Sequence, residues 1–156
     1  MAFKLLTGTF ESTLDDKGRL VIPAPLRERY EGDLVITQGK DSFVWIMTAG
    51  DYENFIAALK KSASSVEEYT AYQYQFEAPA RVTEIDKKTG RIPVPAAIRT
   101  YADLSRDCLV LCINGRLEIW NADSYRAHMQ EIQQTAKEAM KKLGPQGFFQ
   151  PEGQGS

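Results

Sequence analysis

The chain has 156 residues, of which 43% are hydrophobic and 26% charged, and its net charge is −2. These values predict a soluble, globular protein with one ordinary domain or two small ones. They exclude a uniformly basic nucleic-acid binder, so any anion binding has to come from local basic sites. The N-terminal stretch lacks the apolar core of a secretory signal, and no apolar run is long enough to span a membrane. A cytoplasmic location is therefore expected.

The first element in chain order is a phrase that occurs twice. Residues 14–23 are LDDKGRLVIP, and residues 85–95 are IDKKTGRIPVP. With Gly18-Arg19 aligned on Gly90-Arg91, the residues that follow also correspond: Leu20 with Ile92, Ile22 with Val94, Pro23 with Pro95, Leu26 with Ile98 and Arg27 with Arg99. Strand alternation places Leu20 and Ile22 toward a core and Arg19 outward. The phrase therefore predicts a turn, a strand and a short helical turn in each half.

The next elements repeat as well. Residues 33–47 and 108–120 each contain two β-rich runs around a turn, and the Asn114-Gly115 pair is typical of a hairpin. A helix is predicted after each hairpin, because apolar residues recur there at helical spacing. Asp51 and Asn121 are the expected N-caps of these helices. Between the halves, Tyr69, Tyr72 and Phe76 form one stripe of a linking helix, and Tyr74 lies off it.

The expected organisation is a first repeat at 8–54, a linking helical segment at 55–79, a second repeat at 80–123, a C-terminal helix at 124–143 and a disordered tail at 144–156. A repeat of roughly 45 residues can hardly close a core alone. Two repeats in one chain can complete each other, which is a physical reason for the duplication. The fold class is therefore α+β, with two pseudo-symmetric repeats and flanking helices.

The turns of the repeated phrase are the candidate site. Gly18 and Gly90 permit a positive φ where the turn enters the strand. Asp15 and Asp86 can accept hydrogen bonds from backbone N–H groups of the turn, or pair with the following arginine and fix its direction. A stable strand connection alone would explain one such turn. Two copies present two basic fingers with approximate two-fold symmetry, which suits duplex DNA.

The residues GRLEIWNADSY (115–125), together with the two copies of the phrase, resemble the MraZ family of bacterial transcriptional regulators. The resemblance extends to about residue 143. It implies an AbrB-like swapped-hairpin β-barrel in which the two repeats form an internal pseudo-dimer. It also implies a ring of several subunits, and binding to short direct repeats upstream of the division and cell-wall gene cluster, which includes the regulator's own gene.

The same resemblance suggests which residues contact the double-stranded DNA. Asp15 and Arg19 match the family's D-x-x-x-R turn, with Lys17 between them. Asp86 and Arg91 match it with one extra residue, so we expect a wider turn and a different direction for Arg91; Lys88 can replace the charge of Lys17. The expected DNA-binding residues are Lys17, Arg19, Lys88 and Arg91, and the expected turn-supporting residues are Asp15, Gly18, Asp86 and Gly90. The linking segment departs from the family, because it is acidic and lacks the arginines that relatives commonly carry there.

An enzyme is the less favoured class. The lone histidine, His128, lies on the apolar stripe of a helix, and no phosphate loop or dinucleotide fingerprint is present. Cys108 and Cys112 have no usual zinc spacing and are expected to be reduced core residues, as Trp120 is expected to be a core residue. No catalytic residue, metal, cofactor or small-molecule substrate is therefore predicted.

Assembly explains how a net-acidic chain could bind DNA. A ring that presents several basic fingers, each to one repeat of the DNA, gains avidity of ~10²–10⁴ without new contacts. Such a homo-oligomer would associate with the nucleoid. The alternative is an oligomeric protein-interaction module that regulates a partner protein without DNA.

Overall fold

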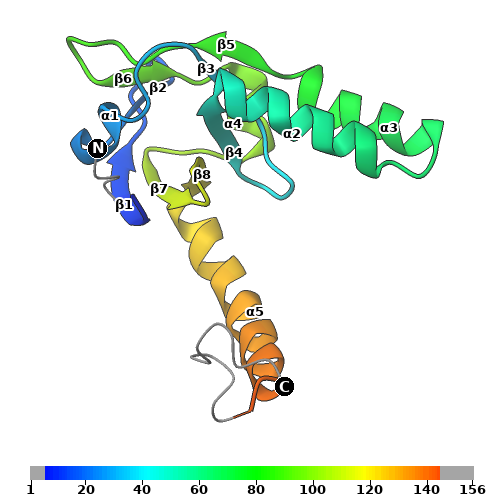
Figure 1. Ribbon diagram of the computed structural model, residues 1–156. Helices are drawn as coiled ribbons and strands as arrows, with labels where there is room; N and C mark the ends of the chain where they lie inside the picture. Colours follow the sequence, from blue (N-terminus) through cyan, green and yellow to red (C-terminus); the bar gives the residue numbers. More distant parts are fainter. Residues whose placement is uncertain (1–5, 145–156) are drawn as a thin grey trace, which may run out of the picture. The chain divides into compact units, whose positions relative to one another are not determined.

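The computed structural model describes residues 6–144 (Figure 1). The described residues form two compact units, of which the first ends at Ala122 and the second begins at Asp123. The elements of the first unit are, in order, β1 (Gly8–Thr13), β2 (Arg19–Val21), α1 (Ala24–Arg27), β3 (Leu34–Gln38), β4 (Val44–Thr48), α2 (Ala49–Ser62), α3 (Val66–Tyr72), the π-helical η1 (Gln73–Glu77), β5 (Arg81–Thr83), β6 (Arg91–Pro93), α4 (Ala96–Tyr101), β7 (Asp107–Ile113) and β8 (Arg116–Asn121). Helix α5 (Ala122–Lys141) begins at the last residue of this unit and runs through the second.

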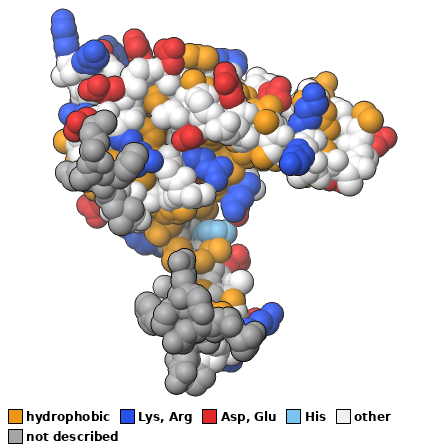
Figure 2. Space-filling model, viewed as in Figure 1, with side chains coloured by type: hydrophobic (Ala, Val, Ile, Leu, Met, Phe, Trp, Pro, Cys, Tyr) orange, Lys and Arg blue, Asp and Glu red, His pale blue; other side chains and the backbone are white. Residues whose placement is uncertain are grey.

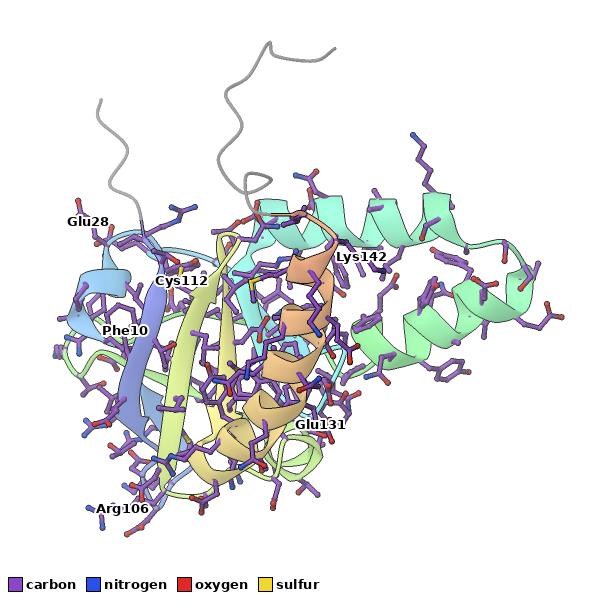
Figure 3. All side chains as sticks on the ribbon, turned by 90° about the horizontal axis from the view of Figure 1, so that it is seen from below. Phe10, Glu28, Arg106, Cys112, Glu131 and Lys142 are labelled. Carbon is purple, nitrogen blue, oxygen red and sulfur yellow. The ribbon has the colours of Figure 1, made fainter. Side chains whose placement is uncertain are left out.

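The strands form a six-stranded sheet in the order β1-β7-β8-β4-β3-β5 and a separate two-stranded ribbon, β2-β6, and every pairing is antiparallel. The first strand of each repeat pairs with the hairpin of the other, because β1 joins β7 and β5 joins β3. Figure 3 shows β1, with Phe10, lying along β7, with Cys112. The fold is thus α+β with strands exchanged between the repeats. Among residues 6–144 the sheet is open, with β1 and β5 at its edges, and no closed barrel is found.

The core of the first unit draws on both repeats. Its fully buried side chains include Leu20 and Ile22, which were predicted to face inward, and their counterparts Ile92 and Val94; Leu26 of α1 and Ile98 of α4 are buried beside them. Trp120 is also buried and stacks on Phe43, with 5.1 Å between the ring centroids. Asn114 and Gly115 have φ values of 53° and 77°, as a tight hairpin turn between β7 and β8 requires. The period-2 pattern of the sequence therefore locates the buried face correctly.

Helix α2 begins earlier than the sequence suggests. Its N-cap is Thr48, whose hydroxyl accepts a hydrogen bond from the Asp51 backbone N–H. The prediction that Asp51 is the N-cap was wrong. Asp51 lies instead in the first turn, where its negative charge interacts favourably with the positive end of the helix dipole. The threonine ends strand β4, so its capping role was hidden by its place in a β-rich run.

The linking segment is helical, and Phe76 is its buried aromatic residue. Phe76 is buried and Tyr74 is 74% exposed, as the predicted stripe requires. The Phe76 carbonyl accepts hydrogen bonds from the Thr37 and Tyr52 hydroxyls at 2.8 and 3.3 Å. These contacts attach η1 to β3 and α2.

Helix α5 is amphipathic, and its apolar residues Ile132 and Met140 are 43% and 41% exposed. Arg126 and Asp123 form an ion pair of 3.0 Å on its first turns. None of the helices within residues 6–144 is both long and apolar enough to cross a membrane. The tail predicted to be disordered lies, from residue 145 on, outside the described residues.

Candidate nucleic-acid interface

The β2-β6 ribbon brings the two copies of the repeated phrase together. Arg19 pairs with Pro93, and Val21 pairs with Arg91, so both arginines lie on the face opposite the buried Leu20 and Ile92. The backbone N–H of Ile22 donates to Gly90 (2.8 Å), and that of Val94 donates to Gly18 (2.9 Å). Because the strands are antiparallel, the two turns lie at opposite ends of one short ribbon.

The first turn is closed by Asp15. Its backbone carbonyl accepts from the N–H of Gly18 (3.0 Å), and its carboxylate Oδ1 accepts from the backbone N–H groups of Lys17 (3.0 Å) and Arg19 (2.9 Å). Gly18 has a φ of 77°, which is unfavourable for any residue with a Cβ. Lys17 is exposed at the tip of the turn.

The second turn is one residue longer. The Gly90 N–H donates to the Asp86 carbonyl at 2.7 Å, four residues back, whereas the corresponding bond in the first turn spans three residues. The Asp86 carboxylate accepts from the backbone N–H groups of Lys88 (2.8 Å) and Thr89 (3.1 Å). The Arg91 N–H donates to the Thr89 hydroxyl at 3.3 Å instead of to the aspartate. Lys88 and its neighbour Lys87 are exposed.

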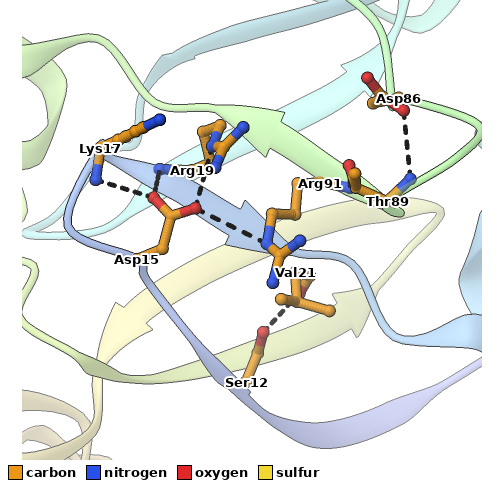
Figure 4. A network of polar contacts seen from close by, with 8 residues as sticks. All are labelled: Ser12, Asp15, Lys17, Arg19, Val21, Asp86, Thr89 and Arg91. Carbon is orange, nitrogen blue, oxygen red and sulfur yellow. Dashed lines mark hydrogen bonds and ion pairs between the residues drawn. The ribbon is translucent and has the colours of Figure 1, made fainter.

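The two arginines converge on one carboxylate (Figure 4). Arg19 Nε donates to Asp15 Oδ2 at 2.9 Å, and Arg91 Nε lies 3.6 Å from the same oxygen. The exposed fractions of the side chains are 42% for Arg19, 36% for Arg91 and 26% for Asp15. The insertion in the second turn therefore changes the partner of Arg91, which approaches the aspartate of the first repeat.

Hydrogen bonds lower the pKa of both aspartates from the ordinary value of 3.8. For Asp15 the largest cause is the backbone N–H of Arg19, reinforced by its side chain and by the Lys17 N–H, while burial acts in the opposite direction. For Asp86 the largest cause is the backbone N–H of Thr89, followed by that of Lys88. Both carboxyls are therefore ionised near neutral pH.

Two further arginines hold the turns, and sequence reasoning gave them no role. The Arg99 guanidinium lies over Gly18 and donates from Nη1 to the Val94 carbonyl. Arg27 lies over Gly90 and donates from Nε to the Ile22 carbonyl at 2.7 Å. Each glycine is thus covered by an arginine of the other repeat. The correspondence of Arg27 with Arg99 in the aligned repeats was the available signal.

Acidic side chains surround the basic ones. A groove beside the second turn is lined by Arg27, Lys87 and Lys88, but also by Glu31, Glu84 and Asp86. On the face seen in Figure 2, the two signs are likewise interspersed. The groove beside the second turn therefore carries both signs of charge rather than a purely basic lining.

The two cysteines are packed in the core. Cys108 and Cys112 are 2% and 1% exposed, and burial raises the pKa of the Cys108 thiol to about 11. Within residues 6–144, no group of three or more His, Cys, Asp or Glu side chains could hold a metal ion.

Comparison with known proteins identifies the family. The family model described as "MraZ protein, putative antitoxin-like" matches residues 5–74 and 76–143. The chain belongs to the MraZ family. Each matched segment of this MraZ chain contains one copy of the turn.

Curated MraZ proteins cover nearly the whole chain. The Treponema denticola protein named "Transcriptional regulator MraZ" is 34% identical over 145 residues, which is 92% of this chain and 100% of that protein. The protein of the same name from Frankia alni is 33% identical over 141 residues, which is 90% of this chain and 98% of the relative. The Thermobifida fusca protein, with the same name, is 32% identical with the same coverage. None of these names is that of an enzyme.

Proposed function

We propose that this chain is a sequence-specific DNA-binding transcriptional regulator. It acts on short direct repeats upstream of the division and cell-wall gene cluster, including its own gene, and is associated with the nucleoid. The observation that carries the proposal is the outward face of the β2-β6 ribbon. This face presents two half-exposed arginines held by a fixed carboxylate.

The dimensions of the ribbon support this role. The turns at Gly18 and Gly90 are four strand positions apart, or about 13 Å at the usual rise of a strand. The major groove of B-DNA is about 12 Å wide and admits a two-stranded β-ribbon. In this arrangement Arg19 and Arg91 face base edges, and Lys17 and Lys88, at the two ends, reach phosphates.

Assembly and the strand exchange complete the proposal. The exchange of β1 and β5 between the repeats supports an AbrB-like swapped-hairpin arrangement. The domain organisation proposed is a first repeat at 8–54, a linking segment at 55–79 and a second repeat at 80–123, followed by the C-terminal helix. Several such subunits in a ring provide the avidity that one ribbon lacks. Light scattering behind a sizing column should give several subunits, and a strict monomer would contradict the avidity argument.

The decisive experiment is a salt titration of binding to the DNA just upstream of the gene. Wild type is compared with Arg19→Ala, Arg91→Ala and the matched control Arg126→Ala, which removes the same charge from α5. Loss of one base-contacting arginine should weaken specific binding by about tenfold or more. Lys17→Ala, which removes a proposed phosphate contact, should reduce the slope of log affinity against log salt by about 0.9.

The outcomes separate the site from the function. Unchanged binding by Arg19→Ala and Arg91→Ala would exclude the ribbon face as the site. Failure of the wild type to bind any upstream fragment would exclude the function. If the chain instead regulates a partner protein without DNA, Arg19→Ala should leave its affinity for that partner protein nearly unchanged.

A further inference from the structure

We propose that Asp15 is a positioning residue shared by the two repeats. Its single carboxylate directs both Arg19 and Arg91, so the two arginines act on DNA as one unit rather than as two equivalent fingers. This inference rests on the proposed DNA-binding function. It goes beyond that function because it assigns the arginine of the second repeat to the aspartate of the first.

The contacts of the two turn aspartates differ in kind. Asp15 uses Oδ1 for two backbone N–H groups of its own turn, which leaves Oδ2 directed at both arginine Nε atoms. The Asp86 carboxylate accepts from the backbone N–H groups of Lys88 and Thr89, and within residues 6–144 it forms no ion pair with an arginine. The second aspartate therefore closes its turn, whereas the first closes its turn and orients two cations.

The longer second turn and the ribbon register together explain this difference. With one extra residue, the Arg91 N–H meets the Thr89 hydroxyl rather than the Asp86 carboxylate. The register places Arg91 opposite Val21, two positions along the strand from Arg19 and on the same face. The nearest carboxylate oxygen to the Arg91 guanidinium is then Asp15 Oδ2 (Figure 4).

Electrostatics favours a carboxylate between the two arginines. Both Nε atoms lie close to one oxygen, so the two guanidinium groups are within about 7 Å, where like charges repel. Asp15 compensates this repulsion and engages each arginine near Nε, which leaves the terminal amino groups directed elsewhere. Arg91 Nε is buried and makes no hydrogen bond within the described residues, so Arg91 is held less tightly than Arg19.

The first test uses the protein without DNA. In wild type, NMR spectra of the arginine Nε–H groups should show Arg19 and Arg91 slowed in hydrogen exchange relative to Arg126. In Asp15→Asn both signals should lose this protection, because Arg19 loses its hydrogen bond and Arg91 loses the charge that holds its Nε in a buried position. In Asp86→Asn both should keep it. Loss of protection for Arg19 alone would overturn the shared role, whether or not the protein binds DNA.

The second test measures the ratio of specific to non-specific DNA affinity at one salt concentration. Removing a carboxylate near DNA raises electrostatic attraction for any sequence, so a merely electrostatic role predicts tighter binding and an unchanged ratio. A positioning role predicts that Asp15→Asn lowers the ratio by about tenfold. Asp86→Asn should affect both DNAs alike and keep the ratio within about twofold. Asp123→Asn on α5 is the matched control for lost charge, and circular dichroism verifies the fold of each variant.

A double-mutant cycle completes the design. Arg91→Lys keeps the positive charge but lacks the Nε–H group. By itself it should lower the ratio of specific to non-specific DNA affinity, and added to Asp15→Asn it should have little further effect. Additive effects of Asp15→Asn and Arg91→Lys, or equal effects of Asp15→Asn and Asp86→Asn on the ratio, would overturn the proposal. If the wild type shows no preference for the upstream DNA, the function fails, and the exchange measurement still decides the role of Asp15.

Discussion

Gly18 permits a quantitative test of how the repeats hold each other. In Gly18→Ala the new Cβ would lie 2.7 Å from Arg99 Cζ and closer still to Nη1, on a backbone with a φ of 77°. The positive φ costs an alanine roughly 1–2 kcal/mol. Displacement of the guanidinium weakens its hydrogen bond to the Val94 carbonyl and adds about 1–2 kcal/mol. The expected loss in the free energy of unfolding is about 2–4 kcal/mol.

Urea denaturation at one fixed protein concentration measures this loss, since the proposed assembly would make stability depend on concentration. Two glycines provide matched controls. Gly32 has a φ of 84° with nothing within 4 Å of the added Cβ, so Gly32→Ala isolates the backbone cost. Gly50 lies in α2 with open space around it, so Gly50→Ala should be neutral or stabilising by up to about 1 kcal/mol. If Gly18→Ala lowered the free energy of unfolding no more than Gly32→Ala does, the conclusion that Arg99 stabilises the contact between the repeats would be refuted.

Two further predictions concern titratable groups. Because the pKa values of Asp15 and Asp86 are lowered in the folded state, their stabilising contribution is present above about pH 4 and is lost as the pH falls through the lowered values. Urea midpoints should therefore decline less steeply below pH 4 in the double variant Asp15→Asn/Asp86→Asn than in wild type, and parallel declines would contradict this. The buried thiols of Cys108 and Cys112 should react with a thiol reagent at about pH 8 only after unfolding in urea, and rapid labelling of the folded protein would show that the core opens.

Local patterns made part of this fold predictable. The alternation around Leu20 and Ile92, the Asn114-Gly115 turn and the stripe that buries Phe76 all depend on neighbours within a few residues, and each was confirmed. The N-cap of α2 was missed because Thr48 also satisfies the β pattern of the strand before it. A residue that serves two elements shows only the stronger of its two signals.

The geometry of the candidate site depends on tertiary contacts and could be predicted only in part. The extra residue of the second turn suggested a different direction for Arg91, but not its approach to Asp15, because that approach requires the register of β2 against β6. The same register brings Arg27 and Arg99 over the glycines of the opposite repeats. No periodicity within one repeat contains information about pairing with the other.

The exchange of strands also constrains how the protein is made. Gly8 pairs with Cys112, and Thr13 pairs with Asp107, so β1 emerges from the ribosome about a hundred residues before its partner. At a synthesis rate of 5–20 residues per second, β1 stays without its partner strand for roughly 5–20 s. The positions of β1 that point to solvent include Thr9, Glu11 and Thr13. The charge of Glu11, near the centre of the unpaired strand, disfavours pairing with another nascent chain and so protects the protein from aggregation during synthesis.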